Sequence, residues 1–250
     1  MLSWFEEWFN SPYYKILYKH RTEQEAALFL NRLIAKYKWP KTCNMLDLAC
    51  GEGRHALFLA QQNYCVTGID IASNSIQKAR EQAKLNRLSS NSLNFVVGDM
   101  RQPFGQQQYQ VIFNLFTSFG YFEQQTDNLT VLHNAHKALL PNGHLLIDFM
   151  NTHKIVANLV PHETKMIDGI YFEIWRYLES GYIVKKIAVS EPNSGKILNF
   201  YERVQAIYPD DFKELFAKSS FKTDNLFGNY NLSDYDSQTS ERQIWVLKPL

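Results

Sequence analysis

Apolar runs and helical periods alternate along the first 150 residues of this 250-residue chain. Each short apolar run ends beside Gly, Asp or Asn, and the stretches between the runs place apolar residues at helical spacing. The runs predict strands at residues 45–49, 65–70, 93–97, 110–115 and 144–149. The stretches between them predict helices at about residues 52–62, 73–88 and 125–139. This alternation is typical of a parallel sheet with helices on both faces.

The first forty residues predict helices before the sheet begins. Thr22 and Glu25 have the spacing of a capping box, and Trp39-Pro40 ends the helix that follows. Residues 4–18 are aromatic and roughly amphipathic, with a new turn expected at Ser11-Pro12. We expect residues 1–40 to form a helical lid over the sheet.

The alternation of apolar runs and helical spacing changes after residue 151. A helix at about 152–159 precedes three strand-like runs, at 171–178, 182–189 and 196–208, which are separated by turns that suit hairpins. A helix at 210–219 and strands at 221–227 and 243–248 then return to the sheet. The chain is therefore predicted to be one globular domain with four segments: a lid (1–40), an α/β core (41–150), a helix with an antiparallel β insertion (151–208) and a return to the core (209–250).

Composition narrows the possible partners. The chain has 26 Lys and Arg against 25 Asp and Glu, and its formal net charge is +1. A nearly neutral chain without a basic cluster is a poor nucleic-acid binder. The longest apolar candidate, 111–122, contains polar residues and is shorter than the roughly 18 residues of a membrane helix. We expect neither nucleic acid nor membrane as a partner.

Three cysteines, Cys43, Cys50 and Cys65, are an odd number without metal-ligand spacing. We interpret them as reduced thiols of a cytoplasmic protein, and we expect no metal. Glu6 and Glu7 near the N-terminus are not typical of a signal peptide. Oligomeric state stays open between monomer and homodimer.

The segment between the first strand and the next helix carries the most informative motif. Gly51 and Gly53 allow a tight turn and a close approach of ligand to backbone. Asp70 ends the second strand, where a carboxylate can accept hydrogen bonds from both ribose hydroxyls. These features alone also fit a dinucleotide site.

Two further acidic positions favour a different ligand. Asp47 lies just before the glycine turn, where it would face a pyrophosphate unfavourably but suits an ammonium group. Asp99 ends the third strand and can accept a hydrogen bond from the adenine amine, while Met100 packs against the ring. A nucleoside with an amino-acid tail and no phosphate is S-adenosylmethionine.

On these residues the sequence resembles class I S-adenosylmethionine-dependent methyltransferases. The resemblance implies a Rossmann-like, doubly wound sheet of about seven strands whose last strand is antiparallel. It also implies a set of cofactor-binding residues: Asp47, Ala49, Gly51, Gly53, Asp70, Ile71, Asp99, Met100 and Asn114. Leu140-Pro141-Asn142-Gly143 is similar to the family's turn before its fifth strand.

The run from Asn114 to Phe122 is similar to a subgroup of small-molecule methyltransferases that includes enzymes acting on amino groups of sugars. By that resemblance Arg21 binds the cofactor carboxylate, and Tyr13 and Tyr121 face the acceptor. An acceptor base is needed only for some acceptors. Its candidates, all expected near carboxyl ends of strands or in the loops that follow, are Tyr121, Asp148, His144 and His153.

Two other functions stay open at this point. A nicotinamide-dependent oxidoreductase also uses a glycine turn and a ribose-binding acid, although Asp47 and Asp99 count against it. A protein that binds S-adenosylmethionine without catalysis is the second alternative, because the acceptor residues are not diagnostic. Asp148 and Asn151 are spaced like a weak metal pair, but a loop-capping role suits them better.

Overall fold

The computed structural model describes residues 4–19, 22–191 and 195–250. Its elements follow each other in the order α1 (Trp4–Phe9), α2 (Pro12–Leu17), α3 (Glu23–Tyr37), β1 (Asn44–Leu48), α4 (Arg54–Gln61), β2 (Cys65–Asp70), α5 (Ser73–Leu85), β3 (Leu93–Val97), β4 (Tyr109–Asn114), α6 (Gln125–Ala138), β5 (Leu139–Met150), α7 (Thr152–Ala157), β6 (His162–Ile167), β7 (Ile170–Glu179), β8 (Tyr182–Ser190), β9 (Ile197–Gln205), α8 (Pro209–Lys218), β10 (Phe221–Phe227) and β11 (Arg242–Pro249).

The larger sheet has seven strands in the order β10-β11-β5-β4-β1-β2-β3. β1 pairs in parallel with β2 and β4, whereas β11 pairs antiparallel with both β5 and β10. This is the predicted doubly wound α/β sheet with its antiparallel last strand. The strand order reverses at β1 and β4, and open α/β sheets bind ligands outside the carboxyl ends of strands at such a point.

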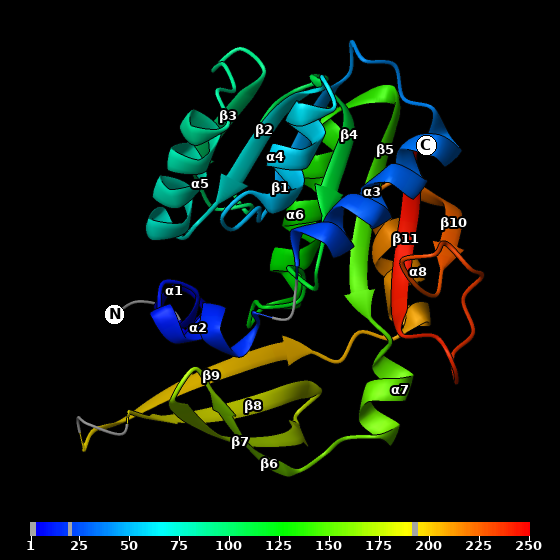
Figure 1. Ribbon diagram of the computed structural model, residues 1–250. Coiled ribbons are helices and arrows are strands. Elements are labelled where there is room, and N and C mark those ends of the chain that lie inside the picture. Colours follow the sequence, from blue (N-terminus) through cyan, green and yellow to red (C-terminus); the bar gives the residue numbers. More distant parts are fainter. Residues whose placement is uncertain (1–3, 20–21, 192–194) are drawn as a thin grey trace.

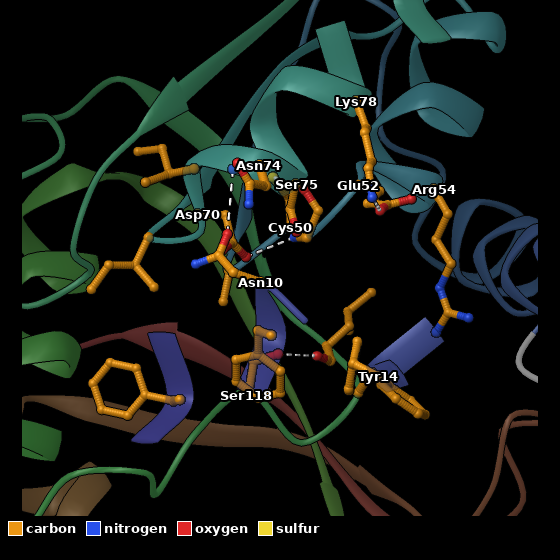
Figure 2. A pocket seen from close by; sticks show the side chains of 18 of the residues that line it. Asn10, Tyr14, Cys50, Glu52, Arg54, Asp70, Asn74, Ser75, Lys78 and Ser118 are labelled. Carbon is orange, nitrogen blue, oxygen red and sulfur yellow. Dashed lines mark hydrogen bonds and ion pairs between the residues drawn. The ribbon is translucent and has the colours of Figure 1, made fainter. Parts of the chain in front are cut away.

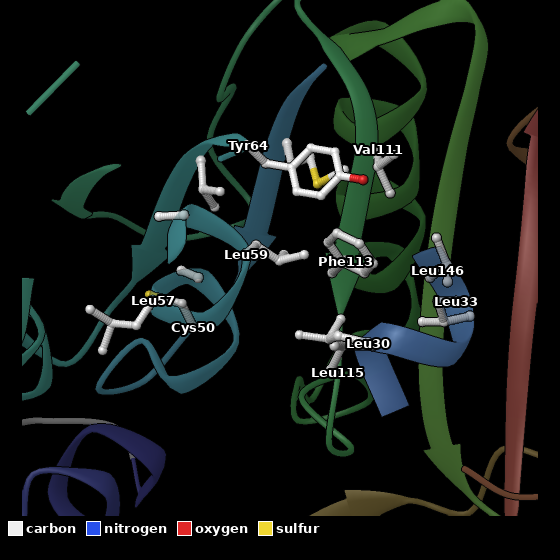
Figure 3. Close-up of a cluster of buried hydrophobic side chains, with 14 of the residues drawn as sticks. Leu30, Leu33, Cys50, Leu57, Leu59, Tyr64, Val111, Phe113, Leu115 and Leu146 are labelled. Carbon is white, nitrogen blue, oxygen red and sulfur yellow. The ribbon is translucent and has the colours of Figure 1, made fainter. Parts of the chain in front are cut away.

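Two apolar cores lie on opposite faces of this sheet. Helices α3, α4 and α5 contribute to one, which includes Leu30, Leu59 and Phe113 (Figure 3). Helices α6 and α8 contribute to the other, which includes Leu132 and Phe212. Both cores are fully buried at these positions, so the sheet is a rigid support for the loops at its carboxyl edge.

A second sheet, in the order β6-β7-β8-β9, forms an antiparallel meander below the larger one (Figure 1). Helices α1 and α2 lie between this meander and the carboxyl edge of the large sheet (Figure 1). A third core joins α1 and α2 to the meander through buried side chains such as Trp8, Leu17 and Ile187. Ser11 caps α2 by accepting a hydrogen bond from the amide of Tyr13, as the predicted turn at Ser11-Pro12 requires.

Two details differ from the sequence prediction. The meander has four strands, whereas the sequence predicted three. The prediction missed β6 because it is a mostly polar edge strand without an alternating apolar pattern. The predicted turn at Pro141–Gly143 lies inside β5 as an irregularity. Tyr109 pairs with Leu139 and Val111 with His144, so the extra β5 residues bulge out of the ladder. A Cβ on Gly143 would lie 3.0 Å from two backbone oxygens, so this tight bulge favours glycine.

No helix in the described part of the chain combines the length and the apolar character that crossing a membrane requires.

Candidate functional site

A cavity of about 570 Å³ lies at the carboxyl edge of the large sheet, with α1 and α2 as its opposite wall. This volume is in the usual range for small-molecule sites. The predicted residues that line it are Ala49, Gly51, Asp70, Ile71, Asp99, Met100 and Tyr121. Figure 2 shows Asp70 and Asn74 on one side, with Asn10, between α1 and α2, facing them. The Asn74 amide donates to Asn10 Oδ1 at 3.4 Å, which joins the turn between α1 and α2 to this end of the cavity.

The glycine turn takes a left-handed path from β1 into α4. Ala49, Gly51 and Gly53 have φ angles of 61°, 55° and 80°. A Cβ on Gly51 would meet nothing within 4 Å, so its backbone is open to a ligand. A Cβ on Gly53 would lie 2.4 Å from Cζ of Phe95, and Gly53 does not line the cavity. The two glycines therefore differ in role: Gly51 leaves room for a ligand, and Gly53 lets α4 pack on the core.

Asp70 connects the ends of β2 and of the glycine turn. Its Oδ2 accepts from the Gly51 amide at 2.7 Å, and its Oδ1 accepts from the Ala72 amide at 2.8 Å. Burial raises the pKa of the Asp70 carboxyl, and the two amide hydrogen bonds oppose this shift. Each carboxylate oxygen retains a further lone pair, so Asp70 can accept from two ribose hydroxyls without giving up its backbone bonds.

Asp99 and Met100 lie at the end of β3. Arg101 binds Asp99 through its side chain, with Nη2 2.6 Å from Oδ2. Partial burial opposes the charge of Asp99, but the hydrogen bonds and charge of Arg101 outweigh it and lower the pKa of this carboxyl. Asp99 is therefore fixed in place as an ionised acceptor beside the apolar Met100 and Ile71, which line the same cavity.

Asp47 and Asn114 lie behind the turn, at the ends of the neighbouring strands β1 and β4. Each is 1% exposed, and neither lines the cavity. Asp47 Oδ2 and Asn114 Oδ1 have no hydrogen-bond partner among the described residues. Burial raises the pKa of Asp47 to about 7, although a backbone hydrogen bond and Arg54 oppose it. Buried oxygens are nearly always bonded, so each atom fits a donor that the described residues do not supply, such as a water that a bound cofactor also contacts.

The other half of the cavity is aromatic. Ring contacts run from Trp4 to Tyr121 (5.3 Å between centroids), from Tyr121 to Phe9 (5.6 Å), from Phe9 to Tyr14 (5.0 Å) and from Tyr14 to Tyr18 (5.0 Å). We call these five residues the aromatic wall. Phe9, Tyr14, Tyr18 and Tyr121 line the cavity. Tyr121 was predicted here, and its pKa lies well above 10 because it is buried.

Tyr13 does not line the cavity, contrary to the prediction. Its hydroxyl donates to Glu191 at 2.7 Å on the meander. Tyr14 and Tyr18 line the cavity instead, because positions four apart share one face of α2 whereas Tyr13 is turned by about 100° from Tyr14. This helical spacing was the signal that sequence reasoning missed. The predicted Arg21 lies outside the described residues.

Three base candidates lie away from the cavity. His144 lies at the opposite end of the sheet, where Trp39 Nε1 is 3.4 Å from its Nδ1 and burial lowers its pKa. His153 packs against Tyr208 from α7. Asp148 is 1% exposed and forms an ion pair with Arg242 at 2.7 Å. Asp148 and His153 lie near or after the carboxyl end of β5 as predicted, whereas the predicted placement of His144 near such an end is wrong. None of the three lines the cavity, so none is placed to act as the base.

A partly buried polar cluster fastens α1 and α2 to the meander. Glu202 accepts from Trp8 Nε1 at 2.7 Å and from the Tyr18 hydroxyl at 2.8 Å. Lys185 donates to the Tyr18 hydroxyl at 2.7 Å and pairs with Glu202 at 3.4 Å. Burial lowers the pKa of Lys185, and the charge of Glu202 opposes that shift. The aromatic wall is thus anchored from both α1 and α2.

Residues 40–205, more than half of the chain, match a family model described as a methyltransferase domain. YqeM of Bacillus subtilis (strain 168), which carries a provisional methyltransferase name, is 30% identical over 126 residues. That match covers 50% of this chain and 49% of YqeM, so the chain matches about half the length of that relative.

Two solved structures share the fold across nearly the whole chain. An S-adenosylmethionine-dependent methyltransferase from Clostridium acetobutylicum ATCC 824 has a TM-score of 0.81 at 13% identity, covering 95% of this chain and 96% of that one. CalS10 with bound S-adenosylmethionine, an amino pentose methyltransferase from Micromonospora echinaspora, has a TM-score of 0.68 at 16% identity, covering 96% and 98%.

Proposed function

Since the chain belongs to the methyltransferase domain family, with S-adenosylmethionine as cofactor, we propose that it methylates an amine of a small molecule. The observation that carries this proposal is one cavity with two unlike ends. One end presents Gly51, Asp70 and Asp99, and the other presents the aromatic wall. Family membership does not support the nicotinamide-dependent alternative.

We place the cofactor along the carboxyl ends of β1 to β4. Asp70 would accept from the ribose hydroxyls, and Ile71 and Met100 would hold the adenine while Asp99 accepts from its amine. The methionine part would follow the backbone of Ala49 and Gly51 towards Asp47 Oδ2 and Asn114 Oδ1, which have no partner among the residues that the structure describes. Bound in this way, the cofactor supplies a methyl group on a sulfonium sulfur, which departs as a neutral thioether.

The chain itself contributes by positioning the two reactants and by excluding water from the site. The aromatic wall encloses the acceptor end, which keeps water from the reacting atoms and attracts the sulfonium cation to the faces of its rings. Orientation of two bound reactants can supply about 7–11 kcal/mol. Anchoring of Tyr18 by Glu202 and Lys185 keeps this part of the wall in one geometry.

An amine suits this end of the cavity better than a hydroxyl. A hydroxyl acceptor needs a base to remove its proton. Burial raises the pKa of Tyr18 and of Tyr121 well above 10, so both stay protonated at neutral pH. An uncharged amine is nucleophilic without a base, and the tyrosine hydroxyls can orient it. The name of CalS10, an amino pentose methyltransferase, agrees with this acceptor class.

The test is a transfer assay with methyl-deuterated S-adenosylmethionine. A panel of amino sugars and aromatic amines, the corresponding hydroxyl compounds, and total RNA would each be incubated with the protein and analysed by mass spectrometry. We expect one or more deuterated methyl groups on an amine and none on the hydroxyl compounds or RNA. Transfer only to RNA or only to hydroxyls would overturn the amine proposal. Tight binding of S-adenosylhomocysteine with no transfer to a cell metabolite extract would support the non-catalytic alternative.

A further inference from the structure

The loop after β4 carries unusual backbone strain beside the cavity. Phe116 and Thr117 both have φ angles of 61°, a left-handed conformation that non-glycine residues rarely adopt, here at two consecutive positions. Such residues cost about 1–3 kcal/mol each and persist only where their surroundings hold them. Phe116, Ser118 and Tyr121 of this loop line the cavity, so the strained pair determines how the acceptor end is shaped.

Asp148 of β5 holds this pair through side chain and backbone. Its Oδ2 accepts from the Phe116 amide at 2.9 Å, and its carbonyl oxygen accepts from the Thr117 amide at 2.8 Å. The Tyr230 hydroxyl donates to the same Oδ2 at 2.9 Å. Asp148 is 1% exposed, so water does not replace these bonds readily.

Arg242 of β11 completes the arrangement. Its Nε donates to Asp148 Oδ1 at 2.7 Å, while its Nη2 donates to the Thr117 hydroxyl at 2.8 Å. One planar guanidinium thus joins the carboxylate to the strained turn, which a single lysine ammonium cannot do in the same geometry. Neither Asp148 nor Arg242 lines the cavity.

We propose that Asp148 and Arg242 are positioning residues for methyl transfer. They hold the Phe116–Thr117 turn in its left-handed conformation, so that the loop after β4 keeps the acceptor in place. The effect on catalysis rests on the proposed function. The residues act on the acceptor end, since the contacts assigned to the cofactor, apart from Asn114 at the end of β4, come from the ends of β1, β2 and β3 and the turns that follow them. Their loss should therefore lower kcat and leave cofactor affinity nearly unchanged.

The first variant is Asp148→Asn, whose single amide oxygen cannot serve both Arg242 and the Phe116 amide. Arg242→Lys is the second, and it keeps a cation beside Asp148 if the first variant does not fold. The matched control is Asp224→Asn, which removes an exposed ion pair with Lys248 at the far strands β10 and β11. Hydrogen exchange of the Phe116 and Thr117 amides reports the turn, and kcat, KM and the Kd of S-adenosylhomocysteine report the site.

We expect either positioning variant to speed exchange of these two amides and to lower kcat by about 10–100-fold, with the ligand Kd changed less than about threefold. Adding Thr117→Gly to Asp148→Asn should recover much of kcat, because glycine adopts a positive φ without strain. Unchanged exchange in both folded variants, or lost kcat that Thr117→Gly leaves unrecovered, would overturn the proposal. A wild-type chain that methylates no acceptor would instead refute the proposed function, and the exchange measurement would still decide the role of Asp148 in the turn.

Discussion

The buried carboxyl of Asp47 makes stability depend on pH in a way that one substitution should remove. Asp47 is 1% exposed, its Oδ2 has no hydrogen-bond partner in the described part of the chain, and burial raises its pKa to about 7. In the unfolded chain an Asp has a pKa of about 3.9. Between these two values the folded protein binds a proton that the unfolded chain has lost, so stability falls as pH rises through this window.

The size of the effect follows from the two pKa values. From pH 5 to pH 7 the folded state keeps its proton at Asp47 and the unfolded state does not, so the free energy of unfolding falls by about 1.4 kcal/mol for each pH unit. Above pH 7 Asp47 is ionised in both states, and the free energy of unfolding falls no further because of it. The wild-type chain should lose about 2–3 kcal/mol at this residue between pH 5 and pH 8. Asp47→Asn keeps the shape of the side chain but does not titrate, so it should not show this loss.

Urea unfolding of both proteins at pH 5, 6, 7 and 8 measures this difference, and their other titrating groups cancel in the comparison. Saturating S-adenosylhomocysteine should reduce the wild-type loss, since its ammonium would favour the ionised carboxylate. A difference between wild type and Asp47→Asn that stays constant across this range would refute the reasoning about Asp47.

Three further outcomes are expected. Asp70→Ala should weaken S-adenosylhomocysteine binding at least about tenfold by calorimetry while the circular dichroism spectrum is retained, because hydrogen bonds to a charged group are lost; equal affinity would refute the ribose assignment. Gly53→Ala should destabilise folding by about 2–3 kcal/mol in urea, since its Cβ meets Phe95, whereas Gly51→Ala should cost about 1 kcal/mol. Equal losses would contradict their separate roles. Glu202→Gln should speed proteolysis within α1 and α2, because both lose a charge-assisted hydrogen bond to the meander; an unchanged digestion pattern would count against this anchoring.

The sequence was sufficient for the large sheet and the glycine turn. Each of its parallel strands contains a short apolar run that ends near Gly, Asp or Asn, so the same few residues mark the end of the strand and the edge of the ligand site. Asp70 is an example, because the end of β2 and the edge of the cavity coincide there. β6 could not be predicted in this way, since its residues carry no strand pattern of their own and form a strand only by pairing with β7.

The acceptor end was harder because its residues come from segments far apart in the chain. Tyr14, Tyr18 and Tyr121 meet only after α1 and α2 pack on the meander. Asp148 has the carboxylate that a base needs, and only the structure shows that Arg242, Tyr230 and the Phe116 amide occupy it. The loop-capping role that the sequence favoured for Asp148 agrees with these contacts.

A crystal structure of the protein with bound S-adenosylhomocysteine tests the central claim most directly. The account predicts the ribose hydroxyls on Asp70, the adenine between Ile71 and Met100, and the sulfur facing the aromatic wall. Ligand density elsewhere, or a ribose in this cavity that does not contact Asp70, would contradict the account.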